Sequence, residues 1–400
     1  MPWEETCVMD ERMAFIVDWQ RDEMGLAALC RYYGVSRKTG YKWIERFESE
    51  GVHGLKDRSR APLHHPNAVS EAAEAAIVAV RVEHPSWGPK KIKAWLKSRR
   101  PRRIWPAQSV IATILDRHGL VQRREIRRRV PLSSMPLSAC ADANDVWGID
   151  FKGWFRTGDG QRCDPLSLSD LASRYVLRLQ AIERTDGEHV WPIIDAAFRE
   201  FGLPLVMRSD SGPPFASVAA GGLSPIAVRL IKAGVLPERI EPGKSQQNGR
   251  HERLHLTVQQ ETANPPAATL RGQQRRFDKF RRVFNEERPH EALGQVPPIQ
   301  VYNPPVTRPY HGKLREPEYP SDDEVRRVRP NGEIKWRNEP TFISQVLAGE
   351  PVGLHEIDED GRWEICYGPI ELGTIDAAGK FCARKAGTRP RLAREAQPQG

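Results

Sequence analysis

Three acidic residues of this chain stand where they could act together on a metal ion. Asp150 lies in a segment with the pattern of a strand (Val146–Phe151), Asp210 directly follows a second such segment, and Glu252 lies on a predicted helix. A single acid in any of these places is more often a surface residue. Carboxylates brought together repel one another unless a cation lies between them, and Mg²⁺ prefers carboxylate oxygens and retained waters. The combination predicts a site for two Mg²⁺ ions.

Phosphodiester cleavage is the chemistry that such a site suits best. The reaction needs a deprotonated water, a stabilised leaving oxygen and neutralised charge on the phosphoryl group, and two divalent ions meet all three needs. Asp150, Asp210 and Glu252 are therefore the predicted catalytic and metal-binding residues.

The segment before Glu252 favours contact with a nucleic-acid backbone. Residues 241–249 are turn formers and small amides that can lie flat against phosphates. The helix that follows would carry Asn248, Glu252, His255 and Gln259 on its polar face. The predicted DNA contacts in this region are Lys244, Asn248, Arg250 and His255.

Strands and helices alternate around these acids, which favours α/β layering. Apolar runs predict strands at Val146–Phe151, Leu166–Asp170, Tyr175–Glu183 and Leu205–Ser209. Helical periodicity predicts helices at Glu188–Phe201, Leu223–Ala233, Gln246–Gln260 and Leu270–Glu286. The last of these carries an apolar stripe of phenylalanines that indicates core packing rather than a ligand site.

Positive charge is concentrated near the N-terminus. The chain has 61 Lys and Arg against 52 Asp and Glu, a net charge of +9, and residues 1–140 hold 25 of the basic and 16 of the acidic residues. The remaining 260 residues are balanced, with 36 of each sign. Such segregation is expected when one module binds a polyanion and another does something else, and nucleic acid is the first candidate.

The first 62 residues have the pattern of a helix-turn-helix. Helices are predicted at Asp10–Gln20 and Gly25–Tyr33, then Gly34 supplies a turn, and Ser36 is suited to cap a third helix that runs to about Glu50. Trp43, Ile44 and Phe47 would face the core. The N-terminal end of this third helix would offer Arg37, Lys38, Tyr41 and Lys42 to DNA. A plain three-helix bundle with a solvated basic face is the alternative.

A second helical set follows at Glu71–Val82, Pro89–Lys97 and Pro106–His118, with Pro106 suited to a first helical position. Residues 90–130 contain 14 basic and two acidic residues, a density that repels itself unless phosphates neutralise it. A second DNA-binding unit is therefore predicted, with Lys90, Lys91, Arg127 and Arg128 as contacts. Residues 131–143 are small, polar and proline-bearing, which indicates a linker.

The C-terminal quarter has the alternation and turn signals of a small β module. Strands are predicted at Gly332–Trp336, Thr341–Ile343, Val352–Ile357, Trp363–Tyr367 and Glu371–Ile375, consistent with a barrel-like domain. The basic tail after Ala383 is expected to be disordered.

The cysteines and the hydropathy of the chain indicate the cellular compartment of the protein. Its six cysteines include no C-x-x-C pair, so neither a disulfide framework nor a cysteine zinc site is indicated. The N-terminus lacks the basic and apolar regions of a secretory signal, and no stretch approaches the ~18 apolar residues of a membrane span. We expect a protein of the bacterial cytoplasm or nucleoid with no membrane partner.

Four sequence blocks, in order, resemble those of insertion-sequence transposases of the DDE class, which are related to retroviral integrases. They are Trp147–Gly153 (WGIDFKG), Arg208–Phe215 (RSDSGPPF), Pro242–Arg253 (PGKSQQNGRHER) and Phe284–Leu293 (FNEERPHEAL). The resemblance implies a ribonuclease-H-like core with Asp150, Asp210 and Glu252 at the metal positions. It also implies Mg²⁺ or Mn²⁺, terminal inverted repeats and target DNA as substrates, and a homo-oligomer on DNA.

The expected fold class is therefore multidomain, with N-terminal all-α helix-turn-helix domains, a central α/β ribonuclease-H-like integrase core and a small C-terminal β module. The expected boundaries are 1–62 and 68–130 for the helical domains, 131–143 for the linker, 144–310 for the core, 325–383 for the β module and 384–400 for the tail.

The function expected from the resemblance is transposition: binding of terminal inverted repeats, metal-dependent strand cleavage and strand transfer. Ser211, Leu256 and Gln259 depart from the residues common in the family. They motivate an alternative, a catalytically silent DNA-binding regulator derived from such an enzyme. A ribonuclease-H-type nuclease without joining activity is a third possibility.

Overall fold

The computed structural model describes residues 7–59, 68–121, 137–240, 249–304, 308–357 and 361–384. The chain divides into two compact units, Met1–Ala68 and Val69–Gly400. Several predicted features lie outside the described residues: Arg127 and Arg128, most of the linker, Lys244, Asn248, the side chain of Arg250 and the basic tail after Arg384. None of the helices in the described ranges is long and apolar enough to cross a membrane.

The N-terminal unit is a helical bundle with a core of its own. It contains α1 (Val8–Arg21), α2 (Leu26–Tyr32), α3 (Arg37–Glu50) and a 3₁₀ turn at Gly51–Leu55. Ser36 caps α3 as predicted, because its Oγ accepts the Thr39 N–H at 3.1 Å. Trp43 and Ile44 are buried in this core, and Phe47 packs against it. The helix-turn-helix pattern therefore forms as the sequence predicted.

A second helical bundle begins the larger unit. It contains α4 (Glu71–Glu83), α5 (Pro89–Arg99) and α6 (Gln108–Arg117), packed around Ile77, Trp87 and Ile111. Pro89 occupies the first turn of α5, as expected. Pro106 does not occupy the first turn of α6: the helix begins two residues later, with Ala107 as its N-cap, so that prediction was wrong.

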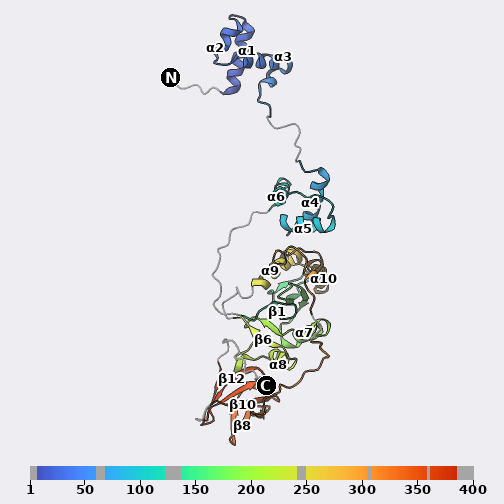
Figure 1. Ribbon diagram of the computed structural model, residues 1–400, viewed down its shortest axis with the longest axis vertical. Helices are drawn as coiled ribbons and strands as arrows, with labels where there is room; N and C mark the ends of the chain where they lie inside the picture. Colours follow the sequence, from blue (N-terminus) through green and yellow to red (C-terminus); the bar gives the residue numbers. More distant parts are fainter. Residues whose placement is uncertain are drawn as a thin grey trace, which may run out of the picture. The chain divides into compact units, whose positions relative to one another are not determined.

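A mixed sheet forms the centre of the larger unit (Figure 1). Its strands are β1 (Val146–Phe151), β2 (Phe155–Arg156), β3 (Arg162–Asp170), β4 (Val176–Ile182), β5 (Val206–Ser209) and β6 (Leu236–Arg239). Strand β3 pairs antiparallel with β1, β2 and β4, and β1, β5 and β6 are parallel neighbours in that order. The sequence did not predict β2 and β6, since β2 is two residues long and β6 reads Leu-Pro-Glu-Arg without apolar alternation.

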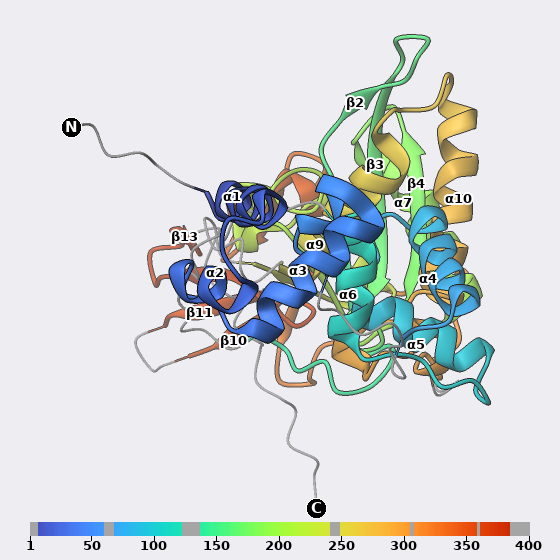
Figure 2. The same cartoon turned by 90° about the horizontal axis from the view of Figure 1, so that it is seen from above.

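Two pairs of helices accompany the sheet. The helices α7 (Gly187–Phe201) and α8 (Pro225–Lys232) share one core with Trp147 and Ile149 of β1. The helices α9 (Gly249–Val258) and α10 (Leu270–Glu286) share another with Val176 and Leu179 of β4. Figure 2 shows α10 alongside β4. Because strand side chains alternate between faces, the two cores lie on opposite faces of the sheet.

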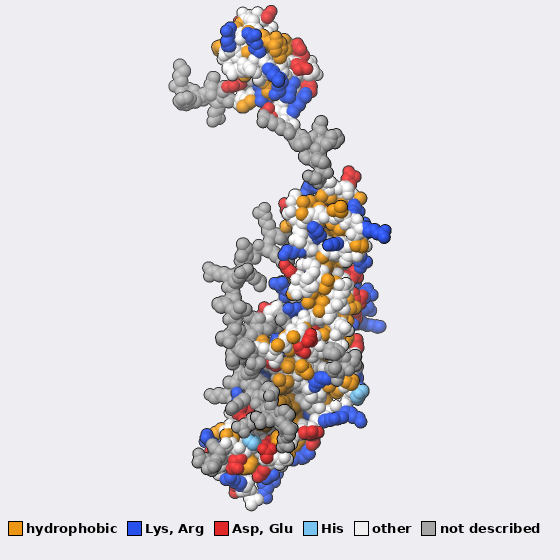
Figure 3. Space-filling view, in the orientation of Figure 1, with side chains coloured by type: hydrophobic (Ala, Val, Ile, Leu, Met, Phe, Trp, Pro, Cys, Tyr) orange, Lys and Arg blue, Asp and Glu red, His pale blue; other side chains and the backbone are white. Residues whose placement is uncertain are grey.

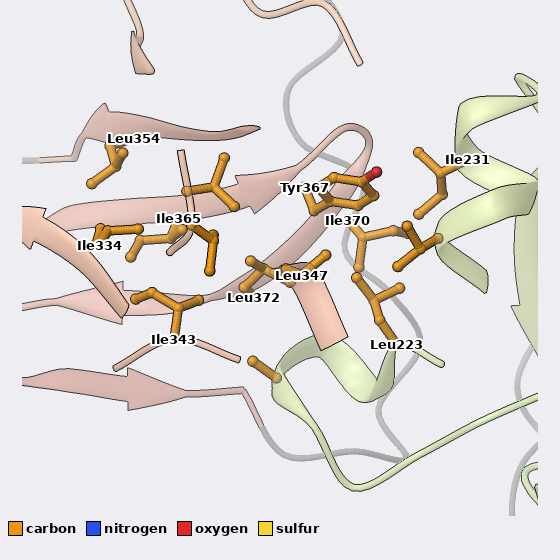
Figure 4. Close-up of a cluster of buried hydrophobic side chains, with 14 of the residues drawn as sticks. Leu223, Ile231, Ile334, Ile343, Leu347, Leu354, Ile365, Tyr367, Ile370 and Leu372 are labelled. Atoms are coloured by element: carbon orange, nitrogen blue, oxygen red, sulfur yellow. The ribbon is translucent and has the colours of Figure 1, made fainter. Parts of the chain in front are cut away.

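The C-terminal part is an antiparallel sheet joined to the core by apolar packing. Five strands pair in the order β13-β12-β11-β10-β7, and β8 and β9 form a hairpin. Leu223 and Ile231 of the central part meet Tyr367, Ile370 and Leu372 of this sheet (Figure 4). The seven strands are β7 (Glu324–Arg327), β8 (Glu333–Trp336), β9 (Glu339–Phe342), β10 (Pro351–Glu356), β11 (Trp363–Tyr367), β12 (Ile370–Ile375) and β13 (Phe381–Ala383). The sequence missed the two edge strands, β7 and β13.

These parts confirm the predicted fold class: N-terminal helical bundles, a central α/β core with a mixed sheet, and a C-terminal β module.

Candidate active site

The strands β1 and β3 offer small polar residues to one face of the sheet. In β1 the apolar Trp147 and Ile149 point toward α7, so Gly148 and Asp150 belong to the opposite face. The antiparallel register places Gly148 opposite Ser169 and Asp150 opposite Ser167. This face therefore presents a glycine, two hydroxyls and a carboxylate in adjacent positions.

Helix α9 lies directly over this face. A Cβ atom on Gly148 would lie only 2.5 Å from His251 Nε2, so the absence of a side chain lets the helix approach. His251 is 1% exposed, and its Nε2 lies 3.0 Å from Ser169 Oγ. Leu254 and Val258 continue the same helix face into the apolar core. The helix is thus fixed by one buried histidine and two aliphatic side chains.

The second histidine of α9 reaches the acidic residue of β1. His255 Nε2 lies 2.8 Å from Ser167 Oγ, and its Nδ1 lies 3.9 Å from Asp150 Oδ2. Ser167 Oγ also lies 3.3 Å from the Asp150 carbonyl oxygen, to which it donates. One hydroxyl therefore connects the His255 ring with the strand that carries Asp150.

Burial keeps both imidazoles neutral near pH 7. It lowers the pKa of His251 to about 3 and the pKa of His255 to about 4, with smaller contributions from His255 and Arg208 at His251 and from Lys152 at His255. A neutral imidazole retains one unprotonated ring nitrogen, which is the form that binds a metal.

Asp210 comes to the same edge of the sheet as Asp150. The strands β1 and β5 are parallel, with Gly148 opposite Arg208, and each aspartate follows two residues later. Burial raises the pKa of Asp210, and the Gly212 N–H, 3.4 Å from its Oδ1, opposes that shift. A half-buried carboxylate beside a second one is a place where a cation is favourable.

Glu252 lies on the exposed side of α9. It follows His251, so its side chain projects about 100° around the helix axis from the buried histidine. Among the described residues, the group around Asp150 whose ligand atoms all lie within 4.8 Å of one another contains His251 and His255. Neither Asp210 nor Glu252 belongs to that group, so the structure brings Asp150 and Asp210 to one edge but does not cluster all three acids.

Some side chains that are predicted to contact DNA are exposed, whereas others are partly buried or bonded to an acidic residue. Arg37, Lys38, Tyr41 and Lys42 are all exposed along α3. Figure 3 shows Lys and Arg side chains gathered on the visible face of this N-terminal unit. Lys90 is exposed but bonds Glu291 at 2.6 Å, and Lys91 and His255 are partly buried. All of these DNA contacts stay predictions.

His251, Ser167 and Ser169 are site residues that the sequence did not single out. A signal was present: His251, Glu252 and His255 form the pattern H-E-x-x-H, which places two histidines on one face of a helix. Ser167 and Ser169 carry no such signal, because alternating serines in a strand are ordinary until a partner helix is known.

Several segments of the chain match known protein families. A helix-turn-helix domain matches residues 11–62, a homeodomain-like domain residues 39–115, an integrase core domain residues 233–298 and the C-terminal domain of IS481 family transposases residues 323–380. These matches cover separate segments of the chain, which resemble helix-turn-helix, integrase core and transposase C-terminal domains. The integrase match includes α9 with Glu252, His251 and His255, whereas β1 and Asp150 lie before it.

Proteins similar to this chain include two from bacterial insertion elements. An uncharacterised 39.2 kDa protein of insertion element IS476 from Xanthomonas euvesicatoria is 25% identical over 251 residues, which is 62% of this chain and 70% of that protein. An uncharacterised 31.7 kDa protein of IS407 from Burkholderia multivorans is 26% identical over 247 residues, 60% of this chain and 86% of that protein.

Solved structures similar to this chain include the HTLV-2 integrase catalytic core domain in complex with magnesium. The TM-score is 0.31 and the identity 14%, over 42% of this chain and all of that one.

Proposed function

We propose that this protein is a DNA transposase that binds the terminal inverted repeats of an insertion sequence, cleaves DNA strands and transfers them to a target. The observation that carries the proposal is the parallel pairing of β1 and β5, which brings Asp150 and Asp210 to one edge of an integrase-type core. The helix-turn-helix domains, with exposed basic residues on α3, support binding to DNA.

In this proposal Asp150, Asp210 and Glu252 hold two Mg²⁺ or Mn²⁺ ions. The donor set fits, because carboxylate oxygens at the end of two parallel strands are ligands that hard cations prefer. Bound there, the ions would supply Lewis-acid stabilisation for the attacking and leaving oxygens of the phosphodiester. Desolvation raises the pKa of Asp210, and a cation bound nearby would favour its ionised form.

Substrate recognition is assigned to the helical domains and to the residues before α9. Arg37, Lys38, Tyr41 and Lys42 would meet one inverted repeat through a major groove. Lys244, Asn248 and Arg250 would hold the backbone near the scissile phosphate. We further propose that a homo-oligomer holds the two ends of the element together.

A strand-transfer assay on terminal-repeat DNA tests the proposal. Asp150→Asn, Asp210→Asn and Glu252→Gln are each expected to reduce Mg²⁺-dependent joining by at least about 100-fold, the scale of losing one transition-state contact. Glu188→Gln, which changes an exposed acid on α7, is the matched control and should retain parental joining. Full joining by either Asp150→Asn or Glu252→Gln would refute the catalytic assignment.

A catalytically silent DNA-binding regulator is the second candidate. One observation favours it: the compact metal-capable group around Asp150 includes neither Asp210 nor Glu252. The two functions separate in the same experiment. Tight repeat binding with neither cleavage nor joining in Mg²⁺ or Mn²⁺ identifies a regulator, and cleavage without joining identifies a nuclease.

A further inference from the structure

Helix α9 carries two histidines that face the same side. His251 and His255 are four residues apart, the spacing that places side chains one above the other on a helix, and both rings lie against the β1–β3 face. In the pattern H-E-x-x-H this spacing is the one by which a helix supplies two imidazoles to a single zinc ion. The two ring centroids are 5.7 Å apart.

Asp150 is the third residue with a potential ligand atom at this point. Its carboxylate and the two imidazoles offer ligand atoms that all lie within 4.8 Å of one another. Within this group His255 Nδ1 and Asp150 Oδ2 are 3.9 Å apart. Two metal bonds of about 2.1 Å span at most about 4.2 Å, so one ion can bond both atoms with little movement of the side chains.

Hydrogen bonds already orient these rings as they are oriented in metal sites. Metal-ligating histidines usually donate the other ring N–H to a neighbouring acceptor, which fixes the tautomer. Ser167 plays this part for His255: when its hydroxyl donates to the Asp150 carbonyl, its Oγ accepts from Nε2–H. That tautomer leaves Nδ1 unprotonated on the side of Asp150 Oδ2. His251 lies between the two hydroxyls, with its Nε2 3.0 Å from Ser169 Oγ and its Nδ1 3.4 Å from Ser167 Oγ.

The ligand types select the ion. Two imidazoles and one carboxylate suit Zn²⁺ and other first-row transition metals, whereas Mg²⁺ favours oxygen ligands and retained waters. The side chains of His255 and Asp150 are only 12% and 14% exposed, so a bound ion would be partly shielded from water. Glu252, on the exposed side of α9, lies outside the group.

We propose that Asp150, His251 and His255 form a transition-metal site that takes Zn²⁺ or a similar ion. This site shares Asp150 with the proposed catalytic site but needs neither Asp210 nor Glu252. Because one carboxylate serves both, Zn²⁺ bound to the histidines would compete with Mg²⁺ for Asp150. A purely structural role for the histidines, as a buried hydrogen-bond network, requires no metal affinity.

Isothermal titration of the full-length protein with Zn²⁺ tests this site directly. Asp322, Asp323 and His355 form a second metal-capable group among the described residues, so the titrations use a His355→Gln background. In that background His255→Gln is expected to weaken Zn²⁺ binding by at least about tenfold, the lower bound for disturbing a metal's immediate surroundings. Asp150→Asn should have the same effect, and Ser167→Ala a smaller one.

Two controls make the outcome specific. Glu252→Gln should keep Zn²⁺ affinity, and so should His189→Gln, which changes an exposed histidine on α7. Circular dichroism shows whether each variant keeps its fold, and His255→Gln retains an amide that can still bond Ser167. Equal Zn²⁺ affinity in His255→Gln and its parent would overturn the inference.

The outcome of the zinc titration can be distinguished from the outcome of the strand-transfer assay that tests the proposed function. Joining that needs Mg²⁺ and Glu252, in a protein with no zinc affinity at this group, would leave the transposase and reject the zinc site. Zinc binding that depends on His255, in a protein that never joins DNA, would support the zinc site and reject the transposase.

Discussion

Gly148 decides how closely α9 can approach the sheet. Its backbone lies against the buried ring of His251, and no other residue type would leave that space. The same glycine belongs to the block WGIDFKG, in which a role was predicted from the sequence for Asp150 alone. The structure adds that the residue two positions before the acid seats the helix that carries Glu252.

Substitution of Gly148 by alanine should therefore destabilise the protein. The new Cβ would lie 2.5 Å from His251 Nε2 and 2.9 Å from Leu171 Cδ2, so both side chains must shift. Overpacking of this kind costs about 1–3 kcal/mol of unfolding free energy, measurable by urea denaturation. Gly249→Ala is the control, because nothing lies within 4 Å of its Cβ. Equal stability of the two variants would contradict this packing.

At the scale of elements, two amide side chains of α10 bond the backbone of β4 at the edge of the sheet. Asn285 accepts the Val176 N–H and donates to the Val176 carbonyl, both at 2.9 Å. Gln274, three turns earlier, does the same for the Ala181 N–H and the Leu179 carbonyl. An edge strand whose backbone groups are bonded by a covering helix is not available to pair with another chain.

Asn285→Leu should remove the hydrogen-bond partner of the Val176 backbone at the edge of β4. Leucine is similar in volume but cannot bond Val176, so a buried N–H and C=O lose their partners at a cost of about 1–3 kcal/mol. Hydrogen exchange at the Val176 amide should accelerate together with the loss of stability. Lys279→Leu, an exposed change on the same helix, is the matched control. Unchanged exchange at Val176 in Asn285→Leu would show that the amide is not the partner that protects it.

At the scale of the larger unit, the α4–α6 bundle is held to the core by charged contacts. Lys90 bonds Glu291, Arg99 bonds Glu287 at 3.0 Å, and Ser86 bonds Glu261. Exposed pairs of this kind contribute little each. Val283 of α10 adds apolar packing against the bundle. Two of the basic residues on α5 are therefore occupied by acids of the core, which the charge count alone could not show.

Lys91 makes the stability of this arrangement depend on pH. Burial lowers its pKa to about 8 from the ordinary value of 10.5, so the folded protein holds this proton less tightly than the unfolded chain. The loss of unfolding free energy that comes from burying the charged Lys91 is complete below about pH 8, and it disappears as the pH rises toward 10.5. Relative to Lys91→Met, the parent should gain unfolding free energy between these values.

Urea denaturation of both proteins from pH 7 to pH 10.5 measures that difference. Lys97→Met, an exposed change on the same helix, is the matched control. A difference between parent and Lys91→Met that stays constant over this range would mean that Lys91 keeps an ordinary environment in the folded protein.

The sequence by itself determined the helices, most central strands and the pattern of the three acids. Local periodicity, caps and turn residues specify these features, and Ser36, α10 and β1 all formed as predicted. Edge strands such as β6, β7 and β13 were not predicted from the sequence, because their formation depends on the neighbouring strand more than on their own residues.

Only the tertiary structure decided which side chains meet. That His255 lies against Asp150 while Glu252 faces solvent depends on the rotation of α9 about its axis, and that rotation is set by Gly148 and by the apolar core behind Leu254. These contacts join residues about 100 positions apart. Local pattern carries no information about such distances, since they arise from packing between elements rather than from the elements themselves.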